Sequence, residues 1–242
     1  MAKIHAMLQG KGGVSKSTCC VTLEQYCRHK EKQTHCIDTD PVNATFSGYK
    51  ALNVTRLELL DDQKRINARN FDELIQIIDR TDCDLIIDNG AASFVPMTHY
   101  LISNQVPALI KEMGHELVIH TVVTGGQALV DTVSGFGQLA SQFPKEADFV
   151  VWENPYWGPV THNGKPFEGM KAYTDNKDRV KAIIRVPELA PDTFGLDYTE
   201  MLRQRLTFEE ALADKDRSIM TRQRLKIIRE NLYQQLDTAG II

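Results

Sequence analysis

Apolar and polar residues alternate along the chain in blocks that favour strands and helices in turn. Short apolar runs bounded by polar or turn residues predict strands at residues 3–8, 34–38, 84–88, 116–123, 147–153 and 180–187. Between them, segments of helical spacing predict helices at residues 16–30, 70–80, 105–113, 127–142 and 164–174, and a last one at 218–236. This alternation predicts an α/β fold with a doubly wound, mostly parallel sheet and helices on both faces. No repeat or composition shift marks a boundary, so we expect one domain over residues 1–242.

The loop between the first predicted strand and the first predicted helix is rich in glycine. It consists of Gly10, Lys11, Gly12, Gly13, Val14, Ser15, Lys16, Ser17 and Thr18. Such a loop can bind a phosphate, because its backbone N–H groups turn inward and the helix N-terminus adds about half a positive charge. Lys-Ser at this place predicts a P-loop, in which Lys16 reaches the β- and γ-phosphates of a nucleotide and Ser17 ligates Mg²⁺. Ser15 departs from the general pattern, which has glycine there.

Acidic residues follow two of the predicted strands, at the edge where ligands of such sheets bind. Asp88 closes the apolar run 84–88 and can hold a Mg²⁺-bound water, although an acidic residue there can also be a simple cap. Asp38 and Asp40 follow the second strand. Carboxylates one residue apart point to opposite sides of an extended chain, so we expect these two to have different tasks.

The composition is ordinary for a globular protein and excludes some classes. The chain has 242 residues, of which 42% are hydrophobic and 25% charged, and its formal net charge is −4. A contact with nucleic acid would therefore need a local basic patch. No apolar run approaches the length of a membrane span, and the five cysteines lack Cys-x-x-Cys spacing, which favours buried reduced thiols. We therefore expect a cytoplasmic protein.

The second lysine of the loop, Lys11, makes the pattern more specific. Lys-Gly-Gly-x-x-Lys-Ser-Thr resembles the deviant Walker A motif of the ParA/MinD superfamily of P-loop ATPases. Longer stretches resemble the TraL and StbB-type plasmid proteins, a branch of that superfamily associated with DNA transfer and plasmid maintenance. These stretches are residues 38–46, 87–91, 99–107, 113–126, 154–159 and 219–227. The resemblance implies a dimer around two ATP molecules, in which Lys11 touches the partner's nucleotide as an arginine finger does.

The resemblance also implies two switch loops. Asp38, Asp40 and Asn43 fall in the first, where Asp40 would orient or activate the attacking water and Asp38 would support it or the metal shell. Residues 89–92 would form the second switch. The implied catalytic residues are Lys11, Lys16, Asp38 and Asp40, and the implied Mg²⁺ ligands are Ser17, Asp88 and Asp40.

Adenine would be bound by residues farther along the chain. Asn154, Pro187 and Glu188 match the places where the superfamily holds the base, although Asn-Pro is also a plain turn signal. The implied activity is slow, partner-stimulated ATP hydrolysis in conjugative transfer or in plasmid positioning and stability. The alternative is an adaptor with negligible hydrolysis, whose ATP-bound dimer recruits DNA, membrane or a transfer-complex partner.

The last predicted helix, at 218–236, is amphipathic and basic. Leu225, Ile228, Leu232 and Leu236 form an apolar stripe, and Arg222, Arg224, Lys226 and Arg229 flank it. The basic residues could hold DNA phosphates or an anionic membrane, or the helix could simply pack its stripe on the sheet. The expected partners are a second copy in the ATP state and DNA or a DNA-binding plasmid protein, with a membrane surface as a further candidate. Association with the nucleoid or the membrane would then belong to one nucleotide state. Residues 152–181 mix aromatic and basic side chains and are predicted to be a partner-binding surface.

Overall fold

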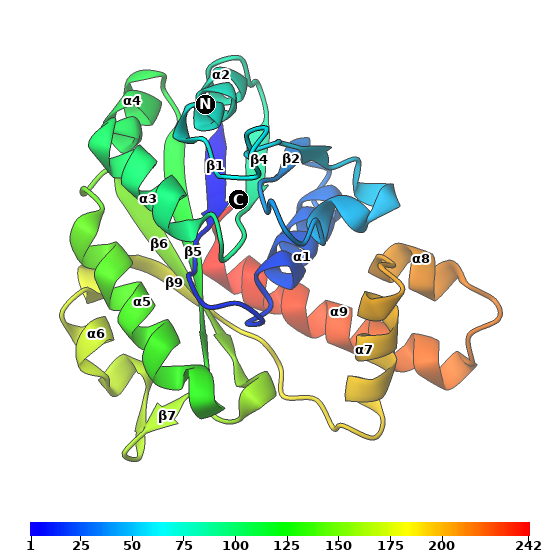
Figure 1. Ribbon diagram of the computed structural model, residues 1–242. Helices are drawn as coiled ribbons and strands as arrows, with labels where there is room; N and C mark the ends of the chain where they lie inside the picture. The colour runs from blue at the N-terminus through cyan, green and yellow to red at the C-terminus, as the bar shows by residue number, and fades with distance from the viewer.

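The computed structural model describes all 242 residues and has one seven-stranded sheet at its centre (Figure 1). The strands lie in the order β3-β2-β4-β1-β5-β6-β9, and every neighbouring pair is parallel. They are β1 (Lys3–Met7), β2 (Thr34–Asp38), β3 (Thr55–Arg56), β4 (Asp84–Asp88), β5 (Glu116–Thr124), β6 (Ala147–Asn154) and β9 (Val180–Arg185). Parallel strands covered on both faces read as apolar runs, which is why the hydrophobic pattern located all of them except the two-residue β3.

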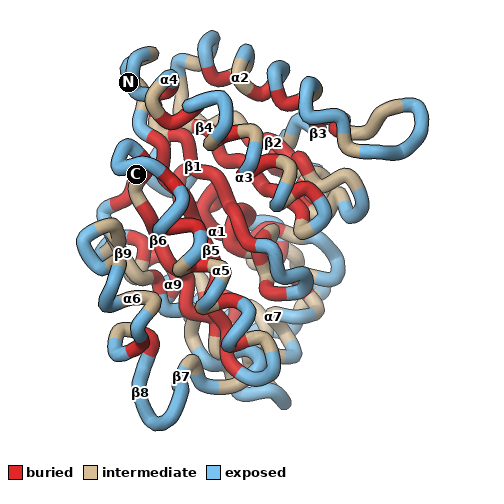
Figure 2. The backbone as a smooth tube through the Cα atoms, turned by 60° about the vertical axis from the view of Figure 1, so that its left-hand side comes forward, coloured by how far each residue is buried: buried red, intermediate tan, exposed pale blue.

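Helices cover both faces of the sheet, so the predicted α/β fold is confirmed (Figure 1). One face packs against α2 (Phe71–Asp79), α3 (Phe94–Ser103), α4 (Val106–Glu112), α5 (Leu129–Gln142) and α6 (Lys171–Thr174). The other packs against α1 (Lys16–His29), α7 (Phe194–Arg203), α8 (Phe208–Ala213) and α9 (Ile219–Ala239). The two faces bury cores of 29 and 27 residues, and the central strands between them are buried along most of their length (Figure 2). No helix combines the length and the apolar character needed to cross a membrane.

Residues 164–174 do not form the predicted helix: only their last turn, α6, is α-helical, and Phe167–Gly169 form a single 3-10 turn. The segment instead begins inside a hairpin of β7 (Thr161–His162) and β8 (Lys165–Pro166). Asn163 and Gly164 have φ angles of 50° and 74°, the values of a tight hairpin turn, and Pro166 lacks the N–H that a helix interior needs. The sequence also failed to predict α3, α7 and α8.

A line of polar side chains crosses the core beneath α1 and α9. Trp152 Nε1 donates to His120 Nδ1 at 3.0 Å, and His120 Nε2 lies 2.9 Å from His5 Nδ1. The Trp152 donor fixes the His120 proton on Nε2, so His120 donates to His5 and the buried Nε2 of His5 is left without a partner. Burial lowers the pKa of His5 to about 3 and lowers that of His120 well below its ordinary value. Both rings are therefore neutral in the folded protein.

Candidate nucleotide site

The glycine-rich loop connects β1, in the middle of the sheet, to the N-terminus of α1. Gly13 and Ser15 have φ angles of 74° and 76°, and Ser15 is the residue that precedes the helix. No side chain caps α1, and its first turn contains no acidic residue. The N-terminal N–H groups and the positive end of the helix dipole are thus available to an anion at the carboxyl edge of the sheet.

Lys16 begins α1 and points back into this loop. Its side chain is largely buried, the residue being 8% exposed, and Nζ donates to the carbonyl oxygen of Lys11 at 3.0 Å. Burial lowers the pKa of Lys16, while the nearby carboxylates of Asp88 and Asp40 oppose that shift. The arrangement places a cation on the inner side of the loop, facing two carboxylates.

Asp88 ends β4 beside the loop, and its carboxylate is incompletely satisfied. The residue is 1% exposed, and its Oδ2 atom has no hydrogen-bond partner. Burial raises the pKa of Asp88 to about 7; the charge of Asp38 adds to the rise, whereas the Ser17 hydroxyl and the Lys16 ammonium oppose it. A buried carboxylate oxygen without a partner fits a cation. Together with the Ser17 hydroxyl it offers oxygen ligands of the kind that Mg²⁺ takes, alongside phosphate oxygens and water.

Asp38 and Asp40 have separate contacts. Asp38 is buried and accepts hydrogen bonds from the backbone N–H groups of Asp40 (3.0 Å) and Ser47 (2.9 Å), so it holds the following loop in place. Asp40 accepts from the N–H groups of Val42 and Asn43 at 2.8 and 3.0 Å. The carboxyl group of Asp40 also lies against the predicted second switch, since a Cβ on Gly90 would come within 2.4 Å of its Cγ. The two predicted switches therefore touch at Asp40.

Lys11 lies on the surface of the loop and is paired within its own chain. Its Nζ atom is 2.7 Å from Oδ2 of Asp131, in the first turn of α5. The two side chains are 44% and 57% exposed, so the pair lies in water and adds little to the stability of the fold. Asp131 was not predicted, because nothing in the spacing of a helix pattern links it to a loop 120 residues earlier.

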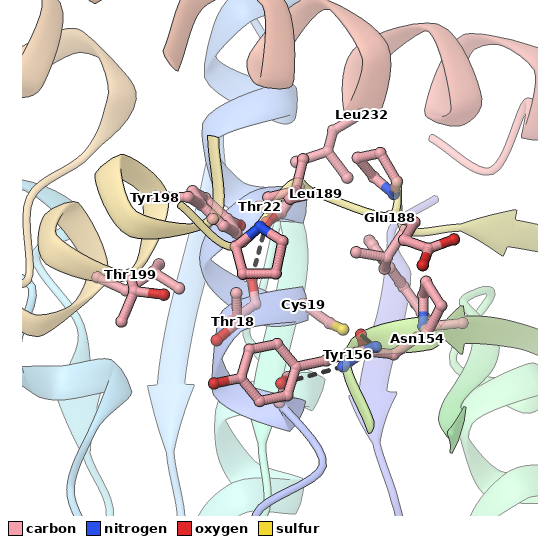
Figure 3. A pocket seen from close by; sticks show the side chains of 18 of the residues that line it. Thr18, Cys19, Thr22, Asn154, Tyr156, Glu188, Leu189, Tyr198, Thr199 and Leu232 are labelled. Carbon is pink, nitrogen blue, oxygen red and sulfur yellow. Dashed lines mark hydrogen bonds between the residues drawn. The ribbon is translucent and has the colours of Figure 1, made fainter. Parts of the chain in front are cut away.

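A cavity of about 540 Å³ opens beside the loop, between the ends of β6 and β9 and helix α7. Asn154, Pro187 and Glu188, the predicted adenine contacts, all line it. Figure 3 shows Asn154 and Glu188 among the side chains of its wall. Gly13, Ser15 and Thr18 of the predicted loop line the cavity too. The sequence reasoning missed most of the remaining wall, which includes Cys19, Thr22, Tyr156, Leu189, Tyr198, Thr199 and Leu202. A largely apolar cavity with a few polar groups, next to a phosphate-binding loop, can accommodate a nucleoside.

Helix α9 buries its apolar stripe, and the four residues Leu225, Ile228, Leu232 and Leu236 all lie in the core. The basic residues beside it are only partly free. Arg224 pairs with Asp197 of α7 at 2.5 Å, and Lys226 lies 3.7 Å from Glu230, while Arg222 and Arg229 are half-buried and pair with no carboxylate. The packing interpretation of this helix accounts for the stripe and for Arg224.

In the predicted partner surface at 152–181, Phe167 is buried, while Tyr156 and Trp157 are 67% and 57% exposed next to the loop. Their rings contact each other edge to face. The exposed aromatic area of this segment is therefore concentrated at the rim of the cavity.

Comparison with known proteins identifies relatives of the whole chain. No family model matches it. Two proteins of Escherichia coli named TraL are 64% identical to it over 242 residues, which is the full length of both chains. Among solved structures, the MinD cell division protein of Aquifex aeolicus is 15% identical, with 98% of each chain covered and a TM-score of 0.55. The septum site-determining protein MinD of Pyrococcus horikoshii, complexed with Mg-ADP, is 15% identical over 100% of each chain, with a TM-score of 0.51.

The structural likeness establishes the fold, which is that of the MinD P-loop proteins. The alignment with the two TraL proteins spans the whole chain and therefore covers every element described above. On this identity, the chain belongs to the TraL protein family.

Proposed function

We propose that this chain is a Mg·ATP-dependent ATPase of the ParA/MinD type, which dimerises in its ATP state and acts in conjugative transfer or in plasmid positioning and stability. The observation that carries the proposal is the group formed by Lys16, Ser17 and Asp88 at the N-terminus of α1, with an unpartnered carboxylate oxygen buried inside it. A related fold, that of the Pyrococcus horikoshii protein, has been solved with Mg-ADP. The proposal assigns residues 1–242 to one ATPase domain, because all the helices pack on one sheet.

In this proposal the backbone N–H groups of residues 10–18 hold the phosphates, and Lys16 pairs with them. Ser17 and Asp88 hold Mg²⁺, which when bound neutralises phosphate charge. The base lies in the cavity lined by Asn154, Pro187 and Glu188.

The switch residues and Lys11 supply the catalytic part of the proposal. Asp40 orients the attacking water and Asp38 keeps the switch loop in place. Lys11 leaves Asp131 to reach the nucleotide of a second copy.

A second candidate function is the nucleotide-binding adaptor with negligible hydrolysis. Its support is that two groups needed for turnover are engaged within the chain: Asp40 caps the Val42–Asn43 turn, and Lys11 is paired with Asp131. Turnover measured on the dimer distinguishes the two functions. An ATPase releases phosphate at a rate that Asp40→Ala abolishes, whereas an adaptor forms the same ATP-dependent dimer without release.

Binding of Mg·ADP, measured by titration calorimetry, tests the shared part of both functions. Lys16→Ala removes a charge-assisted contact worth about 1.5–3 kcal/mol and should weaken binding roughly 10- to 150-fold. Lys145→Ala is the matched control, since Lys145 is exposed and lies just before β6, at the opposite edge of the sheet. Equal affinity of the wild type and Lys16→Ala would refute the phosphate-binding role of the loop.

A further inference from the structure

Both polar atoms of the Asn154 side-chain amide contact groups of the same chain. The residue is 4% exposed; Nδ2 donates to Ser15 Oγ at 3.1 Å and lies 3.5 Å from the carbonyl oxygen of Val14, while Oδ1 accepts from the N–H of Tyr156 at 3.1 Å. The carbonyl oxygen of Asn154 accepts from Thr124 Oγ1 at 2.7 Å, which ties the end of β6 to β5. The amide of Asn154 therefore points at the glycine-rich loop, and both of its polar atoms have partners within the chain.

Ser15, the partner of Asn154, occupies an unfavourable backbone conformation. Its φ and ψ are 76° and 28°, in the left-handed region that glycine adopts freely and a residue with a Cβ does not. Glycine is the usual residue at this place of a P-loop. Serine adds to the strain but also supplies a hydroxyl oxygen that glycine lacks, and that oxygen is the acceptor of the Asn154 hydrogen bond.

The conformation of Ser15 decides where the phosphate-binding groups point. Ser15 immediately precedes α1, and its carbonyl oxygen accepts the N–H of Cys19 at 3.0 Å, the first hydrogen bond of the helix. The N–H groups of Lys16, Ser17 and Thr18 come before that bond and remain directed toward the loop. A change in the Ser15 backbone would reorient all three.

We propose that Asn154 is a positioning residue for the phosphate-binding loop, and that its hydrogen bond to Ser15 holds the loop in its binding conformation before nucleotide arrives. This inference rests on the proposed function only in taking the loop as a phosphate site. It replaces the expected task of Asn154, the recognition of adenine. The contact makes Ser15 an integral part of the site. Asn154, at the sheet edge, holds Ser15 in the left-handed conformation that glycine would adopt without support.

The test is a double-mutant cycle read out with two ligands. Ser15→Ala, Asn154→Ala and the double variant are titrated with Mg·ADP and with Mg·pyrophosphate, which has no base. Loss of one neutral hydrogen bond should weaken each ligand about 2- to 10-fold in either single variant. The double variant should bind no more weakly than the worse single variant, because both changes remove the same contact. A Ser15→Gly background, in which the turn is free of strain, should make Asn154→Ala nearly silent for pyrophosphate.

The alternatives give different results. If Asn154 reads adenine, Asn154→Ala weakens ADP and leaves pyrophosphate unchanged, which overturns the proposal. Additive effects of the two single changes on pyrophosphate also overturn it. If the wild type binds neither ligand, the proposed function fails instead. The positioning contact is then judged by the same cycle in the urea-unfolding free energy of the nucleotide-free protein, where it predicts coupling between the two changes and additivity refutes it.

Discussion

Replacing Asp88 with asparagine should stabilise the nucleotide-free protein while destroying its proposed metal site. Asp88 is 1% exposed and its pKa rises from 3.8 to about 7 in the folded state, chiefly by desolvation. Because folding raises this pKa, the folded state binds the proton of Asp88 more tightly than the unfolded state does. The stability that protonated Asp88 provides below pH 3.8 is therefore lost as the pH rises through about 7. At 1.36 kcal/mol for each unit of pKa, ionised Asp88 costs the folded state about 4 kcal/mol above pH 7. At pH 5 the same carboxyl group is protonated in the folded protein, and the cost falls to less than half of that value.

Urea unfolding of the wild type and Asp88→Asn at pH 5 and pH 8, without nucleotide, measures this difference. The variant should be several kcal/mol more stable at pH 8, and its advantage should shrink by about 3 kcal/mol at pH 5. Asp82→Asn, an exposed aspartate just before β4, is the control and should show no such change. An advantage of Asp88→Asn that does not depend on pH would refute the reasoning, and so would a variant less stable than the wild type at pH 8.

Three further predictions concern other parts of the molecule. Folding lowers the pKa of His5 and His120, so each histidine should lower the free energy of unfolding by about 1.4 kcal/mol for each pH unit below 6.5. The difference in unfolding free energy between the wild type and His120→Gln should therefore narrow from pH 7 to pH 5, and a constant difference would contradict this prediction. Gly90→Ala places a Cβ 2.4 Å from Cγ of Asp40 and should lower the free energy of unfolding by about 1–3 kcal/mol. A thermal unfolding midpoint equal to that of the wild type would contradict this prediction. Asp131→Ala breaks only an exposed ion pair and should change the free energy of unfolding by less than about 1 kcal/mol. Because it releases Lys11, it should also lower the ATP concentration needed for dimerisation in sedimentation experiments, and an unchanged concentration would mean that the pair does not restrain Lys11.

The strands and the loop could be predicted because local chemistry dictates them. Buried parallel strands leave continuous apolar runs, and the pattern placed β1, β2, β4, β5, β6 and β9 within about two residues of their observed ends. The glycine-rich loop could be recognised because few other structures require a stretch of this composition. Asp88 was recognisable because it closes such a run.

What the sequence did not reveal depends on contacts between distant residues. Helix α7 contains Gly195 and has only Met201 fully buried, so its pattern is weak, and one wall of the cavity was missed with it. The expected helix at 164–174 failed because the hairpin turn at Asn163 and Gly164 overrides the apolar spacing after it. The pairing of Lys11 with Asp131 and of Asn154 with Ser15 spans more than a hundred residues in each case, and no local signal announces either contact.

The position of α9 has a consequence for the order of folding. This last helix supplies Leu225, Ile228, Leu232, Tyr233 and Leu236 to the core beneath α1. β1 pairs with β4 and β5 rather than with β2, which follows it along the chain, so even the sheet joins segments far apart in the sequence. Such long-range pairing slows folding. On the ribosome, the glycine-rich loop emerges long before α9, and the face that supports the loop is completed only once α9 has been synthesised. Until then an apolar surface stays open to other chains.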